Sequence, residues 1–171
     1  SHAMVVTRLR LENWRNFSHV DVALGERCFV VGANASGKSN LLDAIRFLRD
    51  IAAPDGGLRS AVDQPSRRSV RLLRSLFARR QTRIVIDVDL QGPVLWRYRL
   101  ELAEQKGLPQ VAGERVERDG QVLLERPDED DGRDPERLTQ THLEQVSANR
   151  SFRELAEELA DIRYLHVVPQ L

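Results

Sequence analysis

The chain has 171 residues, of which 41% are hydrophobic and 30% charged, a length and composition suited to one domain with a hydrophobic core. No apolar run approaches the ~18 residues that a membrane span needs, and the single cysteine, Cys28, rules out a disulfide framework. We therefore expect a cytoplasmic protein. Ser1–Ala3, ahead of Met4, resemble a cloning remnant and are left out of the reasoning about the fold.

The balanced total of 26 basic and 26 acidic side chains hides two oppositely charged segments. Residues 59–83 contain eight arginines and one acid, whereas residues 125–161 contain five arginines and twelve acids. This asymmetry predicts two differently charged surfaces, one of which would meet nucleic acid or an acidic partner.

Three strands are predicted in the first part of the chain. Apolar and polar residues alternate from Val5 to Glu12 and again from His19 to Leu24, on either side of the turn-like residues 13–18. An apolar run over residues 27–31 follows. We expect the first two strands to pack beside this third strand and to bring residues 14–18 close to the segment that comes next.

That segment, Gly32 to Ser39, has the phosphate-binding-loop (Walker A) pattern of glycine, four residues, glycine, lysine and serine. Its glycines let successive backbone N–H groups point at a phosphate, and the positive end of the following helix adds to this attraction. Lys38 would contact the β- and γ-phosphates, and the Ser39 hydroxyl would ligate Mg²⁺. The alternative is a glycine-rich turn that binds nothing.

The choice of lysine supports the binding interpretation. Lys38 and Lys106 are the only lysines in a chain that otherwise uses arginine, and a phosphate cage suits a compact ammonium better than a broad guanidinium. An amphipathic helix is predicted after Ser39, with Asp43 and Asp50 on its polar face, ending near Pro54.

The stretches Leu11–Phe17, Gly32–Asn40 and Leu41–Ile45 resemble the N-terminal part of RecF/SMC-type ABC ATPases, within them most closely the AAA-type ATPases related to the OLD family. The resemblance implies binding of ATP and Mg²⁺ and a role in a DNA transaction such as repair or phage defence. It also implies that the nucleotide is contacted by Arg15, Asn16, Phe17, Gly32, Ala33, Asn34, Ala35, Ser36, Gly37, Lys38, Ser39 and Asn40.

An arginine-rich amphipathic helix is predicted over residues 66–80. One interpretation is a helix lying along the phosphates of a nucleic acid, with contacts from Arg67, Arg68, Arg71 and Arg74. The alternative is a solvated helix whose arginine stems cover apolar surface.

Period-two alternation then predicts strands over residues 84–90, 96–102, 111–118 and 121–125, the last two joined by the hairpin signal Asp119–Gly120. This antiparallel meander fits the β-rich lobe that ABC ATPase heads attach to their nucleotide core. Asp87 ends an apolar run, as the Mg²⁺-binding acid of a Walker B strand does. We do not assign it that role, because the alternation continues through Leu90.

The rest of the chain is predicted as an acidic mobile loop over 127–135, a helix over 136–146, a second helix from Phe152 to Ala160 and a strand over 162–168. Ser151 and Glu154 have the spacing of a capping box for the second helix. Gln170 stands where the resemblance implies a glutamine that senses Mg²⁺ or its water; the alternative is a surface glutamine.

The predicted fold is thus α/β, a P-loop NTPase of the ABC ATPase-head type with an antiparallel β-meander subdomain and an incomplete core. Its expected divisions are residues 4–54, 55–81, 82–126, 127–135 and 136–171. The preceding hairpin argues against a small-molecule kinase.

After Lys38 there is no Leu-Ser-Gly-Gly-like signature motif and no second apolar run that ends in Asp–Glu, so we expect little hydrolysis by this chain alone. The missing groups would come from a C-terminal half of the same ATPase or a second head, in an ATP-dependent dimer. The alternative is a nucleotide-sensing or partner-docking module that does not hydrolyse ATP.

Overall fold

The computed structural model describes residues 4–15, 17–24, 35–65, 67 and 83–162. Its centre is a six-stranded sheet in the order β2-β1-β3-β4-β5-β6, with every neighbouring pair antiparallel. The strands are β1 (Val5–Trp14), β2 (Phe17–Ala23), β3 (Ile84–Gln91), β4 (Leu95–Gln105), β5 (Leu108–Arg118) and β6 (Gln121–Arg126). The helices are α1 (Ala35–Ala52), α2 (Leu58–Val62), α5 (Glu129–Arg133), η1 (Pro135–Thr139), η2 (Arg150–Phe152) and α6 (Arg153–Ala160).

The predicted meander is confirmed, and it is joined to the N-terminal hairpin in one sheet. β1 pairs with β3, with Leu11 opposite Ile86, so that β1 and β2 extend the meander. The β5–β6 turn has the expected residues, Asp119 and Gly120, at φ values of 49° and 82°. Both are left-handed, as the tight hairpin turn requires. The predicted strand over residues 27–31 lies outside the described residues.

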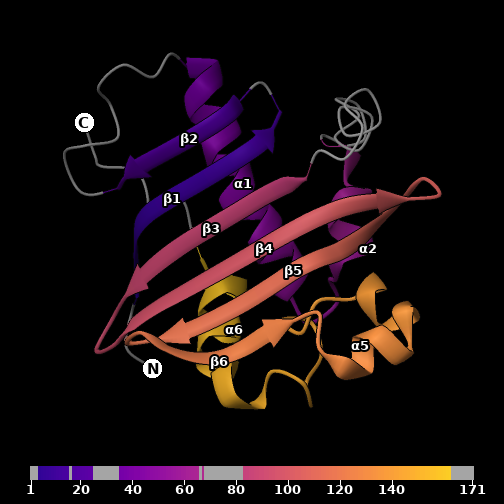
Figure 1. Ribbon diagram of the computed structural model, residues 1–171. Coiled ribbons are helices and arrows are strands. Elements are labelled where there is room, and N and C mark those ends of the chain that lie inside the picture. Colours follow the sequence, from indigo (N-terminus) through magenta and orange to yellow (C-terminus); the bar gives the residue numbers. More distant parts are fainter. Residues whose placement is uncertain (1–3, 16, 25–34, 66, 68–82, 163–171) are drawn as a thin grey trace.

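One face of the sheet carries the hydrophobic core. α1, α2 and α6 lie behind the sheet in Figure 1, against the side chains that alternation along the strands directs to that face. Leu9, Ile86 and Leu100 are among these fully buried side chains. α1 crosses behind the strands and ends near Pro54, as predicted. The sheet therefore serves as the base on which α1 is placed.

The opposite face carries a cross-strand ion-pair network centred on Asp87. This side chain is fully buried and is contacted by Arg10 at 3.2 Å, Arg97 at 2.9 Å and Arg99 at 3.2 Å. Arg10 and Arg99 stand directly opposite Asp87 on the neighbouring strands. Three guanidinium groups thus pair with the Asp87 carboxylate, and these contacts give Asp87 a structural role.

The acidic segment 127–135 is not the loop that its charge predicted. It contains α5, where the Asp128 side chain accepts a hydrogen bond from the Asp131 backbone N–H and the Asp131 side chain accepts one from the Asp128 backbone N–H. Asp131 is buried because Arg126 forms two hydrogen bonds of 3.0 Å with it. Arg126, the last residue of β6, thus neutralises the negative charge of Asp131, and for this reason the acidic segment is not fully solvated.

The following segment differs from its prediction in two places. The expected helix over 136–146 is a short 3₁₀ helix, η1, followed by turns. α6 forms as expected, but Ser151 lies in η2 and the cap position is Phe152, with no side-chain capping bond. Phe152, Leu155 and Leu159 are buried, so packing of the apolar face holds α6 without the predicted capping box.

Several predicted features lie outside the described residues. They are the arginine-rich helix over 66–80 apart from Arg67, the strand after Ile162, and Gln170. Within the described ranges, no helix is both long enough and apolar enough to cross a bilayer.

Candidate nucleotide-binding site

The phosphate-loop motif leads into α1. The helix begins at Ala35, so the last five residues of the motif, 35–39, already form its N-terminal end. The first backbone N–H groups of a helix have no partner within it and carry its partial positive charge. Lys38 and Ser39 are therefore placed on the end of the helix that favours a phosphate. Gly32, Ala33 and Asn34 lie outside the described residues.

The turn between β1 and β2 is fastened to the first turns of α1. Trp14 is fully buried, and its Nε1 donates a hydrogen bond of 2.9 Å to the backbone carbonyl of Asn40. Its ring packs on Phe47 with 5.3 Å between the ring centroids. Phe17 pairs with Trp14 across the turn. Residues 14 and 17 thus lie beside the helix that the motif begins, and Asn16 lies outside the described residues.

Arg15 extends this contact by one helical turn. Its guanidinium group donates two hydrogen bonds to Asp43 Oδ2, at 3.0 and 2.6 Å, and it lies 5.9 Å from the centre of the Trp14 ring. Asp43 was expected on the solvated face of α1, yet it is 7% exposed. The polar face of α1 is therefore buried at Asp43 as well as the apolar face, because arginine side chains cover it.

Arg67 is the second arginine on that side, and its position corrects a prediction. It is 2% exposed and donates hydrogen bonds to Asp43, to Asp50 at 2.8 Å and to the carbonyl of Ala61 at 2.8 Å. Its guanidinium also lies 5.1 Å from the centre of the Phe47 ring. A side chain buried in these contacts is not available to nucleic-acid phosphates. Arg68, Arg71 and Arg74 lie outside the described residues.

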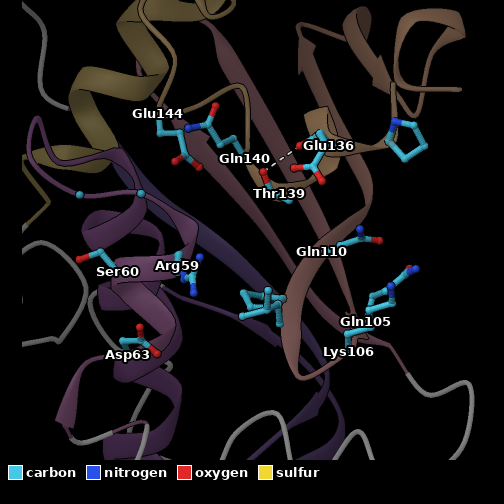
Figure 2. A pocket seen from close by; sticks show the side chains of 15 residues that line it. Arg59, Ser60, Asp63, Gln105, Lys106, Gln110, Glu136, Thr139, Gln140 and Glu144 are labelled. Carbon is cyan, nitrogen blue, oxygen red and sulfur yellow. Dashed lines mark hydrogen bonds between the residues drawn. The ribbon is translucent and has the colours of Figure 1, made fainter. Parts of the chain in front are cut away.

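A groove of about 900 Å³ lies at the other end of α1. Figure 2 shows polar side chains entering it from α2 and the following turn, from the β4–β5 hairpin and from η1; they include Arg59, Ser60, Asp63, Gln105, Lys106, Gln110, Glu136, Thr139 and Gln140. The groove begins at Gly56, just after α1, and the 18 residues of that helix span about 27 Å. It is therefore distinct from the phosphate loop.

Sequence reasoning did not find this groove, nor the contacts of Asp43. The groove is lined by three segments that are far apart in the chain, and none of them has a motif. For Asp43, the one signal was the presence of two acids, Asp43 and Asp50, on a helix in an arginine-rich chain. That signal does not say which arginines pair with them.

The sequence pattern Gly32–Ser39, which runs into the start of α1, is the phosphate-binding loop of a P-loop NTPase domain. Two family models agree with this class. One, described as "AAA domain, putative AbiEii toxin, Type IV TA system", matches residues 28–167, and the other, "P-loop containing region of AAA domain", matches residues 6–49. Because the first match spans most of the chain, the protein belongs to this AAA-domain family.

Among curated proteins, the chain is similar to the "DNA replication and repair protein RecF" of several bacteria. It is 45% identical to that of Agrobacterium fabrum over 58 residues, which are 33% of this chain and 14% of the relative. It is 44% identical to that of Brucella abortus (strain 2308) over 57 residues, again 33% and 14%. For Bacillus mycoides the identity is 37% over 46 residues, 26% of this chain and 12% of the relative.

The chain thus covers only a small part, about a seventh, of these relatives. No solved structure gave a significant match.

Proposed function

We propose that this chain binds ATP with Mg²⁺ through residues 32–39 and forms the nucleotide-binding part of an ATPase that acts on DNA in the cytoplasm. The observation that carries the proposal is the start of α1 inside the motif, which presents the positive end of a long helix where the phosphates would lie. The phosphate loop and the family membership support the choice of nucleotide.

The residues have separate proposed roles. Lys38 contacts the β- and γ-phosphates and Ser39 ligates Mg²⁺, while the backbone N–H groups of the loop surround the phosphates. The turn after β1 supplies the wall beside the loop; the contact of Arg15 with Asp43 supports a place for Arg15, Asn16 and Phe17 next to the nucleotide. Asn34, Ser36 and Asn40 complete the site, and Gln170 is proposed as a contact to Mg²⁺ or its water.

Hydrolysis requires groups beyond this loop. Something must orient the attacking water and neutralise charge on the far side of the γ-phosphate. We propose that these groups come from a C-terminal half of the same ATPase or from a second head in an ATP-dependent dimer. The similarity to RecF proteins, which are named for DNA replication and repair, supports a role in DNA repair, and phage defence is the alternative role that we propose.

The second candidate function is a nucleotide-sensing or partner-docking module that does not hydrolyse ATP. One observation favours it: Asp87, the carboxylate that most resembles a Walker B acid in the described part of the chain, is occupied by three arginines. A sensing module needs only binding and a conformational response, which the loop and α1 can supply without that acid.

The two lysines provide a matched test in the full-length protein. Lys38→Gln removes the charge at the loop, and Lys106→Gln removes the same charge in the β4–β5 turn. We expect Lys38→Gln to weaken MgATP binding by about tenfold or more, because a charged hydrogen bond contributes ~1.5–3 kcal/mol, and Lys106→Gln to leave it unchanged. Equal affinities for both variants would refute the proposed site.

ATP turnover then separates the two candidate functions. Hydrolysis that is lost in Lys38→Gln and retained in Lys106→Gln supports the ATPase. Binding without turnover, at concentrations that favour dimers and in the presence of DNA, supports the sensing module.

A further inference from the structure

Two arginines from distant parts of the chain converge on Asp43. Arg15, in the turn after β1, contacts Oδ2 at 2.6 Å, and Arg67, after α2, contacts Oδ1 at 3.1 Å. Each arginine also places its Nε within 3.3 Å of Oδ2. Both carboxylate oxygens are therefore engaged, and all three side chains are nearly buried.

The position of Asp43 on α1 gives this contact its importance. Asp43 follows Ser39 by four residues, so the two lie on the same face of the helix, one turn apart. Next to Arg15, Trp14 donates a hydrogen bond to the backbone carbonyl of Asn40, the residue that follows Ser39 in α1. The β1–β2 turn thus contacts α1 at two residues, Asn40 and Asp43, that lie shortly after the end of the motif.

We propose that Asp43 is a positioning residue for the nucleotide site: through Arg15 and Arg67 it sets where Lys38 and Ser39 stand relative to the β1–β2 turn. This inference rests on the proposed function. Mg²⁺ requires near-ideal geometry at oxygen distances of about 2.1 Å, and a site loosened by a fraction of an ångström loses affinity. A displacement of Ser39 should therefore lower mainly the part of the nucleotide affinity that depends on Mg²⁺.

The loss of Asp43 would leave two buried guanidinium groups facing each other without the anion that holds them together. Such cations separate or seek water. Because Arg67 is also held by Asp50 and by the Ala61 carbonyl, Arg15 is the freer of the two and the turn that carries it is the part released. Asp43→Asn retains the shape and one acceptor oxygen while it removes the charge.

Asp50 provides the matched control. It is the other carboxylate held by Arg67, at 2.8 Å, and it lies seven residues beyond Asp43 on the same helix, away from the loop. Asp43→Asn and Asp50→Asn each remove one anion from Arg67, and both are expected to lower thermal stability. We expect Asp43→Asn to weaken MgATP binding about tenfold and Asp50→Asn to change it by less than about twofold.

The Mg²⁺ dependence separates positioning from a general loss of structure. In the full-length protein, nucleotide affinity is measured with Mg²⁺ and with a chelator. We expect Asp43→Asn to reduce the gain in affinity that Mg²⁺ provides, and Asp50→Asn to preserve it.

Arg15→Gln is a second route to the same contact, since this side chain is 11% exposed and its removal leaves Asp43 paired with Arg67. We expect Arg15→Gln to weaken binding as Asp43→Asn does, Arg15→Lys to fall between it and the wild type, and the double variant Arg15→Gln/Asp43→Asn to be no weaker than either single change. Additive losses would overturn the proposal.

The proposal is also overturned if wild-type protein binds MgATP, Lys38→Gln does not, and folded Asp43→Asn and Arg15→Gln bind as tightly as wild type; the proposed function would then survive. If the wild-type protein fails to bind MgATP, the proposed function itself is wrong, and the positioning role falls with it.

Discussion

Arg126 and Glu114 form a fully buried ion pair, with 2.8 Å between Nη1 of the arginine and Oε1 of the glutamate. Tyr98 donates to the same carboxylate at 2.6 Å, and Arg126 also donates to Asp131 and to the carbonyls of Arg137 and Gln140. The pair joins β5 and β6 to the segment that carries α5 and η1. It is the reason why an acidic stretch of sequence is folded against the sheet.

Removal of one partner of this pair should be costly. Arg126→Met would leave Glu114 and Asp131 without their shared cation, and breaking a buried pair in this way costs about 3–5 kcal/mol. Arg133→Met is the control, because Arg133 is 73% exposed and its pairs are worth about 0.5 kcal/mol or less. Urea denaturation at pH 7 measures both, and similar values for the two variants would contradict the importance of the buried pair.

Stability should fall between pH 6.5 and pH 4 because of His142. Burial, followed by the nearby positive charge of Arg126, lowers the pKa of His142 from 6.5 to about 4, and its Nδ1 has no hydrogen-bond partner. The charged groups around it are Arg126, Asp131, Arg137 and Asp128. A histidine kept neutral in the folded protein stabilises it fully above pH 6.5, and that stability is lost as the pH falls towards the folded pKa.

The loss in the free energy of unfolding that His142 causes should be roughly 1–3 kcal/mol. Denaturation curves recorded at successive pH values measure it. His142→Gln should flatten the profile in this range, whereas His19→Gln, at an exposed position on β2, is the control. A second decline is expected only below about pH 3.8, because hydrogen bonds from Arg126 lower the pKa of Asp131 despite its burial. An unchanged profile for His142→Gln would count against the histidine.

Asp87→Asn tests the network on the outer face of the sheet. The change leaves Arg10, Arg97 and Arg99 crowded around a neutral side chain, and we expect a loss of about 2–4 kcal/mol in the free energy of unfolding. Asp21→Asn breaks the solvent-exposed pair with Arg8 and should cost far less than Asp87→Asn. In MgATP binding, Asp87→Asn should equal wild type; a specific loss of Mg²⁺-dependent affinity would instead identify Asp87 as a metal-binding acid.

Gly57, the residue just before α2, has a backbone conformation that other residues avoid. Its φ is 123°, and a Cβ atom there would come 2.6 Å from Oε2 of Glu144. Gly57→Ala should therefore lower the free energy of unfolding by about 1–3 kcal/mol. In Gly132→Ala the new Cβ meets nothing within 4 Å, and in the helix α5 it should be neutral or stabilising by up to about 1 kcal/mol. Thermal unfolding of both variants distinguishes the two sites.

Local patterns were sufficient for most of the elements. The alternation of apolar residues predicted the strands from β1 to β6, and Asp119–Gly120 predicted the last hairpin. The apolar stripe predicted α1, and the helix-breaking residues from Pro54 onward predicted where it ends. Each of these signals is contained in a short stretch of chain, so it survives folding unchanged. The same holds for the motif at Gly32–Ser39, whose place at the start of a helix follows from the pattern itself.

Charged residues were predicted less well, because their partners are distant in the chain. Arg67 was predicted either to contact nucleic acid or to lie on a solvated helix, yet it pairs with Asp43, 24 residues away, and Arg15 contacts the same carboxylate across 28 residues. Asp131 was assigned to a mobile loop, although Arg126 buries it. From sequence, a run of arginines or acids looks solvated, because burying a lone charge is expensive.

The residues of this chain alone thus established a P-loop class, its antiparallel strands and the helix that the motif starts, since these depend on periodicity and on the conformational demands of a few glycines. Tertiary structure alone decided that the N-terminal hairpin and the meander share one sheet and that Asp43 holds Arg15 and Arg67 together. The physical reason is that a charge is buried only where a partner from elsewhere in the fold contacts it. The local sequence around neither residue shows that the two will come together.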